Sequence, residues 1–523
     1  MRHAPGLLAL ALAAPLAAQT SWSPLAPTAD VSRTLFTAPL PAELVLERHR
    51  PLGLFATAGN PAAAVFDLET TFSSYRVGLS HAGGTYRRPL DLQTASAPGV
   101  AVAAEARVTD RFAAAGGVAL DAVAANPSSY AHELLPYGSS PLAEADTSTS
   151  AVRRPAARLD GALAWRAGRW GFGGAVSYEA VDNRTLETRL PRFGHASFPA
   201  AALGVVRVLG PVTLGLRARY VYGYEHFHIV AHGANGTAYD LQGLSDPQVR
   251  TISSASDYFR RYLRDGTGVQ ASAAGHAAGI AWVADVERVN QREEQTSIEF
   301  SAHPPYDRWR AEGWHYDAAV RHALPWSWGE LTGRLSSLSF DGAAVLASVR
   351  GIFYESHESL LDLAGEWRWS PADSSWRLGA TLATRHHVLN QQDFLSLRTA
   401  SLDAWEPAFT FSAAHRMHSG VWWEAGTGMA WHYAASSFPD PDSTSLPYQK
   451  YVAPALSLEA TRASGHSYRI AFMGPLKETA HWWATVDYTI SHPAFHATIL
   501  PRGPVPSARR GDVMLTTGIA VGL

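Results

Sequence analysis

Two histidines in one extended segment are the sharpest candidate for metal chemistry. The stretch Glu225-His226-Phe227-His228 is followed by His232. In a strand, alternate side chains point to the same face, so His226 and His228 could offer imidazole nitrogens to one metal ion. Two ligands specify a metal poorly, and a chain with 22 histidines contains such a pair by chance. We therefore expect ordinary histidines at the rim of a longer structure, and no cofactor.

Three arginines in and beside the same segment could set the charge of a pore. Arg217 and Arg219 alternate with an apolar face, and Arg207 lies in the preceding segment. If the apolar face meets lipid, the arginines line a wet lumen, where charged side chains tune selectivity. They could equally form salt bridges on a solvated inner wall, and the pattern leaves both interpretations open. The apolar face is formed by Val212, Leu214, Leu216, Ala218, Tyr220 and Tyr222.

No local signature of an enzyme stands out. The chain has no GxSxG, P-loop or HExxH motif, and its Ser, His and Asp residues form no recognisable set. The absence of cysteine excludes disulfides, thiolate zinc sites and cysteine nucleophiles. A net charge of −3, with 17% charged residues, gives no electrostatic reason to expect nucleic acid. We predict that the protein is not an enzyme and has no nucleic-acid partner.

The first residues have the pattern of an export signal. Arg2 precedes an apolar run over residues 7–14, and Ala17-Ala18 offers a cleavage point. The run is shorter than the roughly 20 apolar residues of a transmembrane helix. We predict a signal peptide over residues 1–19 and export through the Sec pathway. No apolar stretch of spanning length follows residue 19, so a membrane could be crossed only by strands.

Long alternating hairpins dominate the remainder of the chain. Residues 158–182, 358–388 and 403–433 each contain a short turn with tryptophan close to it. Polar or Pro/Gly-rich connections such as 121–157, 231–265 and 434–449 separate such hairpins. Short turns at one end, long loops at the other and aromatic girdles at the lipid interfaces are typical of outer-membrane barrels.

These patterns predict an all-β, transmembrane, antiparallel up-and-down β-barrel. We expect it to cover residues 66–523, with residues 20–65 as an N-terminal segment or small plug. The strand count should lie between about 14 and 18, with 16 the best guess. The expected location is the bacterial outer membrane. Outer-membrane lipid and the barrel-assembly machinery are the expected partners.

The end of the chain resembles a closing barrel strand. An apolar face is formed by Val513, Leu515, Ile519, Val521 and Leu523. Such strands usually end in an aromatic residue, and here the last residue is Leu523. Because unpaired backbone groups are prohibitively costly in lipid, this strand must pair with the first barrel strand, over about residues 66–80.

Several segments resemble a family of uncharacterised outer-membrane barrels of Bacteroidota and relatives. The resemblance implies fold and location, but no activity. A weaker similarity, through the Asn-Pro-Ala stretch, is to FadL-type fatty-acid transporters, in which it would imply an N-terminal hatch. We favour a turn as the explanation of Asn-Pro over a shared hatch, since proline fixes φ. The segments are Gly59-Asn60-Pro61-Ala62, Leu135-Pro136-Tyr137, Ser177–Arg184, Ala238–Leu244, Tyr258 with Tyr262, and Gly266-Thr267-Gly268.

Passage of a small solute through the lumen is the function that these observations favour. The barrel pattern, the arginines and the lack of catalytic signatures support it. A structural or surface-docking barrel that holds a lipoprotein or receptor partner is an alternative, because the long connections would suit it. FadL-like uptake of hydrophobic compounds is a third, which predicts an apolar pocket and a kinked wall strand. Pro454, within an expected strand over residues 450–462, is the hint for that kink.

Overall fold

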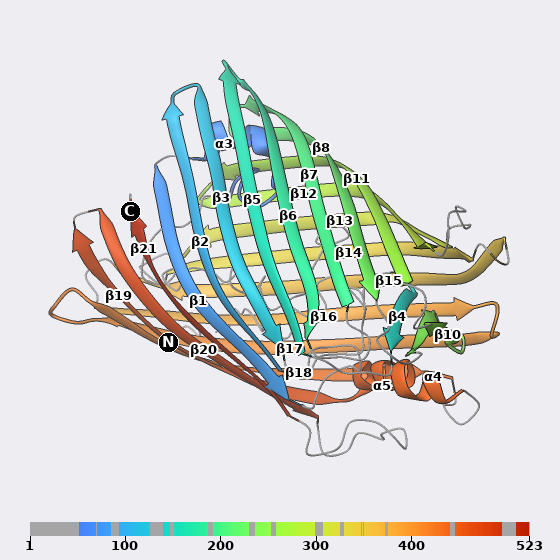
Figure 1. Ribbon diagram of the computed structural model, residues 1–523. Helices are drawn as coiled ribbons and strands as arrows, with labels where there is room; N and C mark the ends of the chain where they lie inside the picture. Colours follow the sequence, from blue (N-terminus) through green and yellow to red (C-terminus); the bar gives the residue numbers. More distant parts are fainter. Residues whose placement is uncertain are drawn as a thin grey trace, which may run out of the picture.

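A wall of eighteen antiparallel strands closes into a barrel within the described part of the chain (Figure 1). Each strand is hydrogen-bonded to the next barrel strand along the chain, and the last one pairs with the first. The computed structural model describes residues 52–68, 71–84, 94–125, 140–146, 151–186, 192–229, 236–252, 258–298, 307–324, 329–346, 348, 350–371, 375–439, 445–477, 479–493 and 509–521.

The barrel strands are long, as strands that cross a membrane at a tilt must be. Their bounds are β1 (Phe72–Gly84), β2 (Thr94–Thr109), β3 (Phe112–Ala125), β5 (Ala151–Ala167), β6 (Trp170–Leu186), β7 (Arg192–Leu209), β8 (Val212–Ile229), β11 (Tyr258–Ala277), β12 (Ile280–Ile298), β13 (Asp307–Ala323), β14 (Glu330–Leu346), β15 (Gly351–Trp369), β16 (Trp376–Asp393), β17 (Arg398–Arg416), β18 (Trp422–Ser437), β19 (Ala463–Lys477), β20 (Ala480–Pro493) and β21 (Arg510–Val521).

The predicted fold class is confirmed, and the described residues form 18 barrel strands, at the upper end of the expected range and two more than the best guess of 16. The alternation of apolar and polar residues is hard to recognise in β2 and β3, because Ala and Gly occupy both faces of these strands. Such strands offer no contrast between an apolar and a polar side. The barrel itself starts at Phe72, six residues after the predicted boundary at residue 66.

Strand β21 closes the barrel against β1. Tyr75 lies opposite Ile519, and Leu79 lies opposite Leu515. The predicted pairing of the last strand with the first is therefore present, although β1 begins and ends later than expected. Leu515 and Ile519 are exposed on the outer face, as are the side chains that flank them in β1. Leu523 lies outside the described residues.

The two faces of the wall differ as a lipid-facing barrel requires. Leu214, Leu216 and Tyr220 point outward and are about half exposed, while the side chains between them point inward. Tryptophans Trp165 and Trp170 stand on the outer face beside the β5–β6 turn. An apolar outer face with amphipathic rings at its border fits a lipid interface. No helix in the described residues is long and apolar enough to cross a membrane.

Short turns and larger connections lie at opposite ends of the barrel. The β2–β3, β5–β6 and β7–β8 turns have two residues each. The segment with η2 (Pro61–Ala63) and α3 (Ala64–Asp67) lies at this short-turn end, seen at the top of Figure 1. We call residues 52–68 the plug.

The opposite end carries additional elements, seen at the lower right of Figure 1. A small antiparallel sheet has the order β10-β9-β4, and two helices follow β18. We call these elements the cap. Their bounds are β4 (Leu142–Asp146), β9 (Gly236–Gln242), β10 (Gln248–Ile252), α4 (Leu446–Tyr451) and α5 (Ala453–Ala460). Pro454 therefore lies in a helix, and the expected kinked strand over residues 450–462 is wrong.

Candidate functional site: the plug, the chamber and the cap

The plug rests on wall glycines that leave room for it. Gly171 and Gly173 of β6, Gly204 of β7 and Gly215 of β8 point into the lumen under the plug. A Cβ at Gly173 would stand 2.6 Å from the backbone N of Ala62, and one at Gly171 would stand 2.7 Å from the Ala62 carbonyl oxygen. These separations are far below van der Waals contact. Glycine is therefore required here for close approach of two backbones.

Asn60 fixes the plug to this floor. Its side chain is fully buried, its Nδ2 donates to the Leu216 carbonyl at 3.0 Å, and its Oδ1 accepts from the Ala62 N–H at 3.1 Å. Asn60 thus caps the short helix η2, whose first residue is Pro61. Gly59 precedes it with φ +65°, a conformation that favours glycine. The Gly59-Asn60-Pro61-Ala62 stretch is therefore a turn and an anchor at once.

Apolar contacts and one buried carboxyl complete the plug. Leu54 and Ala62 pack against Val206 and Val283 of the inner wall. Asp67 Oδ2 accepts a hydrogen bond from the Phe55 N–H at 2.7 Å. Burial raises the pKa of Asp67 to about 6, although this hydrogen bond acts in the opposite direction. The plug therefore holds a carboxyl that titrates close to neutral pH.

Arg217 and Arg219 lie on the inner wall, bound to Glu287 of β12. Arg219 donates to both Glu287 oxygens, at 2.5 and 2.6 Å. Arg217 contacts Glu287 at 3.5 Å and also donates to the Gly59 carbonyl of the plug at 3.0 Å. Both predicted features, a place on the lumen side and salt bridges, thus occur together. Arg217 is in addition a direct link between wall and plug.

Arg207 is on the other side of the wall, contrary to the sequence-based expectation. Strands β7 and β8 pair Arg207 with Leu214, whose side chain points outward. Its guanidinium stacks over the Trp170 ring at 4.9 Å, on the outer face near the short turns. The inward neighbour is Val206, which is 1% exposed. The two-residue turn after Leu209 sets this alternation, so Arg207 does not line the lumen.

His226 and His228 share a face, and it is the outer one. Both rings stack on Phe259 of β11, at centroid distances of 5.8 and 4.2 Å. Their place near the end of β8 is beside the larger connections. Among the described residues, no group of three or more His, Asp or Glu is arranged to hold a metal ion. The geometry therefore resembles an aromatic stack at the rim.

A chamber of about 310 Å³ lies between the plug and the inner wall. Arg385 of β16 binds Asp362 of β15 through two hydrogen bonds, at 2.7 and 2.9 Å. His315 of β13 contacts Asp317 and Ser336 at 3.2 Å each. The chamber wall is formed by Thr57, Ala58, Gly59, Arg217, Arg219, Gln270, Glu287, Val289, His315, Asp317, Ser336, Leu338, Leu360, Asp362 and Arg385.

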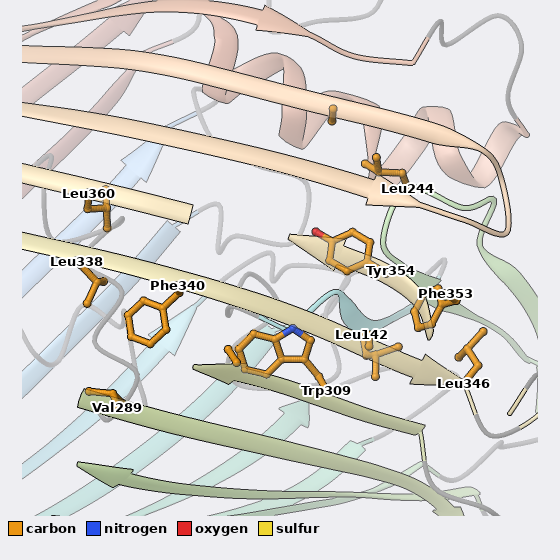
Figure 2. Close-up of a cluster of buried hydrophobic side chains, with 13 residues drawn as sticks. Leu142, Leu244, Val289, Trp309, Leu338, Phe340, Leu346, Phe353, Tyr354 and Leu360 are labelled. Atoms are coloured by element: carbon orange, nitrogen blue, oxygen red, sulfur yellow. The ribbon is translucent and has the colours of Figure 1, made fainter. Parts of the chain in front are cut away.

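Buried aromatic and aliphatic side chains hold the cap against the wall (Figure 2). Leu142 of β4 and Leu244, which follows β9, pack with Trp309 of β13 and with Phe353 and Tyr354 of β15. The same cluster continues to Val289, Leu338 and Leu360, which also line the chamber. The cluster that holds the cap therefore extends along the wall to the chamber, which the plug residues Thr57, Ala58 and Gly59 line directly.

Polar contacts anchor the cap at defined points. Asp393 is fully buried and accepts hydrogen bonds from the N–H groups of Leu244, Leu395 and Ser396 and from the Ser245 hydroxyl. On the other side of the cap sheet, Arg260 of β11 donates to Asp240 of β9 at 2.9 Å. Gln295 of β12 donates to the Leu142 carbonyl at 2.9 Å.

A second polar group joins three connections at the outer edge of the cap. Asp246 contacts Arg398 at 3.3 Å and accepts a hydrogen bond from the Ser445 N–H at 2.9 Å. Burial opposes the charged form of Asp246, but these partners outweigh it and hold its pKa below the ordinary value. Arg398 lies over the Tyr448 ring at 5.0 Å, and burial raises the pKa of Tyr448 to about 12. The plug and the cap are thus each attached to the wall by their own set of contacts.

Comparisons with known proteins place the chain in a family. The family model described as a family of unknown function, DUF6850, matches residues 61–519. A comparison with curated proteins finds no match, and no comparison supports the similarity to FadL-type transporters. The match begins at Pro61, so Gly59 and Asn60 lie outside it.

The comparison with solved structures finds matches at low identity and low TM-score. The ferric citrate transporter FecA in its unliganded form is 8% identical, with a TM-score of 0.40 over 87% of this chain and 79% of FecA. The alcaligin receptor FauA from Bordetella pertussis is 9% identical, with a TM-score of 0.40 over 85% and 75%. The copper transporter OprC is 10% identical, with a TM-score of 0.37 over 86% and 80%. Such values carry no argument about function. The chain belongs to the family of unknown function DUF6850, as the match over residues 61–519 shows.

Proposed function

We propose that this protein is an outer-membrane barrel through which a small solute passes, and that the plug closes the short-turn end of the passage. The apolar outer face and its aromatic border support the membrane location. The charged inner wall supports a hydrated lumen, because ionised side chains would be costly in a dry one.

The observation that carries the proposal is the absence of wall side chains at the glycines that face the plug. A wall that only had to be filled would place its own side chains in the lumen. Instead, the wall has glycine at Gly171, Gly173, Gly204 and Gly215, where a separate chain segment lies. If the plug moves away from these glycines, it breaks a few hydrogen bonds and exposes only small surfaces of the wall and of itself. This construction favours a plug that moves.

A matched pair of glycine variants tests the proposal. Gly173→Ala places a Cβ 2.6 Å from the Ala62 N and should displace the plug. Gly174→Ala makes the same change at the next residue, where the nearest atom of Leu203 on the outer face is 3.5 Å away. In proteoliposomes diluted into glucose, we expect swelling with Gly173→Ala and none above wild type with Gly174→Ala.

The alternative of a docking barrel predicts a different result. It requires no passage, so both variants should remain as impermeable as wild type. Equal swelling rates in the three proteins would therefore overturn the proposal, provided that Gly173→Ala still shows the gel shift of a folded barrel on boiling. FadL-like uptake receives no support, because charged groups line the chamber and Pro454 lies in a helix.

A further inference from the structure

The chamber between the plug and the inner wall has polar and apolar lining residues, as a solute-binding site does. We propose that it binds an uncharged, polyhydroxylated solute of the size of a mono- or disaccharide, an inference that rests on the proposed passage function. Its volume of about 310 Å³ lies at the lower end of the roughly 300–1,000 Å³ of small-molecule sites.

The charges of the chamber balance each other. Three arginines and three carboxylates are among its lining residues. Arg219 and Arg217 bind Glu287, and Arg385 binds Asp362. Because the three guanidinium groups and the three carboxylates balance in number, the site has little net charge to hold an ion. This balance favours a neutral ligand over an anion or a cation.

The groups that a ligand can reach are mainly hydrogen-bond acceptors. The Asp362 side chain is 42% exposed, whereas its partner Arg385 is only 12% exposed. Asp317 and His315 are 28% and 29% exposed, and Arg217 is 12% exposed. Accessible carboxylates with arginines behind them accept hydrogen bonds strongly. Hydroxyl groups supply the matching donors without adding charge.

An apolar surface completes the match. Val289, Leu338 and Leu360 line the chamber and lie together at one side of the cap cluster in Figure 2. A sugar ring has hydroxyl groups around its edge and C–H groups on its face. Its edge can therefore bind Asp362 and Asp317 while one face packs on the leucines. A fully charged solute would leave this apolar surface without a partner.

Calorimetric titration of the purified full chain tests the inference. Glucose and maltose serve as neutral probes, gluconate as an anionic one and glucosamine as a cationic one. We expect saturable binding of a neutral probe at least tenfold tighter than binding of either charged one. Asp362→Asn leaves Arg385 without its carboxylate, so it should weaken the neutral probe at least tenfold and create binding of gluconate.

Asp341→Asn is the matched control, because Asp341 lies on the outer face, is 77% exposed and contacts His357. It should bind as wild type does. Preferential binding of a charged probe by wild type, no binding of either neutral probe, or equal effects of the two variants would overturn the inference. If the neutral probes fail to bind but Gly173→Ala vesicles swell, the chamber assignment falls and the passage function stands.

Discussion

The plug and the cap both fill the lumen, but they are attached in different ways. The plug lies on glycines and is held by Asn60, by Arg217 and by small apolar contacts such as those of Leu54 and Ala62. The cap is held by aromatic side chains such as Trp309 and Phe353, and by the buried Asp393. Removal of large side chains from contact costs about 25 cal/mol per Å² of apolar surface, so the cap is expensive to displace. On the proposed passage function, the short-turn end is therefore the one that we expect to open.

The largest expected effect is that of Asp393→Ala, a change in wall strand β16, on the stability of the cap. In the cap, the variant removes the acceptor of the buried Leu244 N–H and of the Ser245 hydroxyl. It also removes the acceptor of the Leu395 and Ser396 N–H groups, which lie in the β16–β17 turn. At about 1–3 kcal/mol for each buried unsatisfied group, the loss of both bonds should cost the cap roughly 2–6 kcal/mol of local stability. Hydrogen exchange should accelerate over residues 236–252 and stay unchanged over residues 52–68. Asp403→Ala, at an exposed outer-face carboxylate, is the control. Unchanged exchange in the cap would show that the aromatic cluster alone holds it.

Lowering the pH should stabilise the seated plug, because Asp67 is then protonated. Burial raises the pKa of Asp67 to about 6 in the seated plug, against about 3.9 in an open chain. Seating therefore favours the protonated carboxyl. Stability is fully present below about pH 4 and falls as pH rises to 6, by up to about 3 kcal/mol. Hydrogen exchange over residues 52–68, corrected for intrinsic rates, should be slower at pH 5 than at pH 7.5.

Asp67→Asn should remove this pH dependence, because an amide does not titrate in that range. The cap has no part in it, so exchange over residues 236–252 is the internal reference. Slower corrected exchange of the plug at pH 7.5 than at pH 5 would contradict the assigned role of Asp67.

Arg217→Met should loosen the plug by a smaller amount. The variant loses the hydrogen bond to the Gly59 carbonyl, while Arg219 continues to compensate Glu287. A charged hydrogen bond of this kind contributes roughly 1.5 kcal/mol. Exchange over residues 52–68 should accelerate about tenfold, and exchange in the cap should not change. If hydrogen exchange accelerates in the plug and in the cap together, the two regions are one cooperative unit, and the contrast between their attachments fails.

Arg207→Ala should have the smallest effect. The contact of Arg207 with Trp170 is on the outer face, and a cation–π contact at an exposed site contributes about 0.5–1 kcal/mol. The temperature at which the barrel unfolds in gel-shift experiments should fall slightly, without change in plug exchange. Faster hydrogen exchange in the plug of this variant would indicate that Arg207 lies in the lumen.

Local alternation was enough to predict the barrel and several of its faces. Residues 212–222 repeat so regularly that the outward position of Leu214 and Leu216 follows from period two alone. The position of Arg207 failed because it depends on the length of the turn after Leu209, which shifts the alternation of the preceding strand.

The remaining features depend on contacts between distant parts of the chain. Glu287 lies 68 residues from Arg219, so no local spacing indicates their pairing. The connections around β4 and β9 were predicted as long loops, but these two strands pair with each other across the chain. The glycines under the plug are visible in the sequence, yet only the fold shows that Ala62 lies against them.

Single-channel recording tests the central claim most directly. The full chain and a variant without residues 52–68 are compared in planar bilayers, after a gel shift on boiling shows that both are folded. We predict no steady conductance for the full chain and a stable one for the variant, because its short-turn end is then open. A folded variant as silent as the full chain would contradict the account, since the plug would then close no passage.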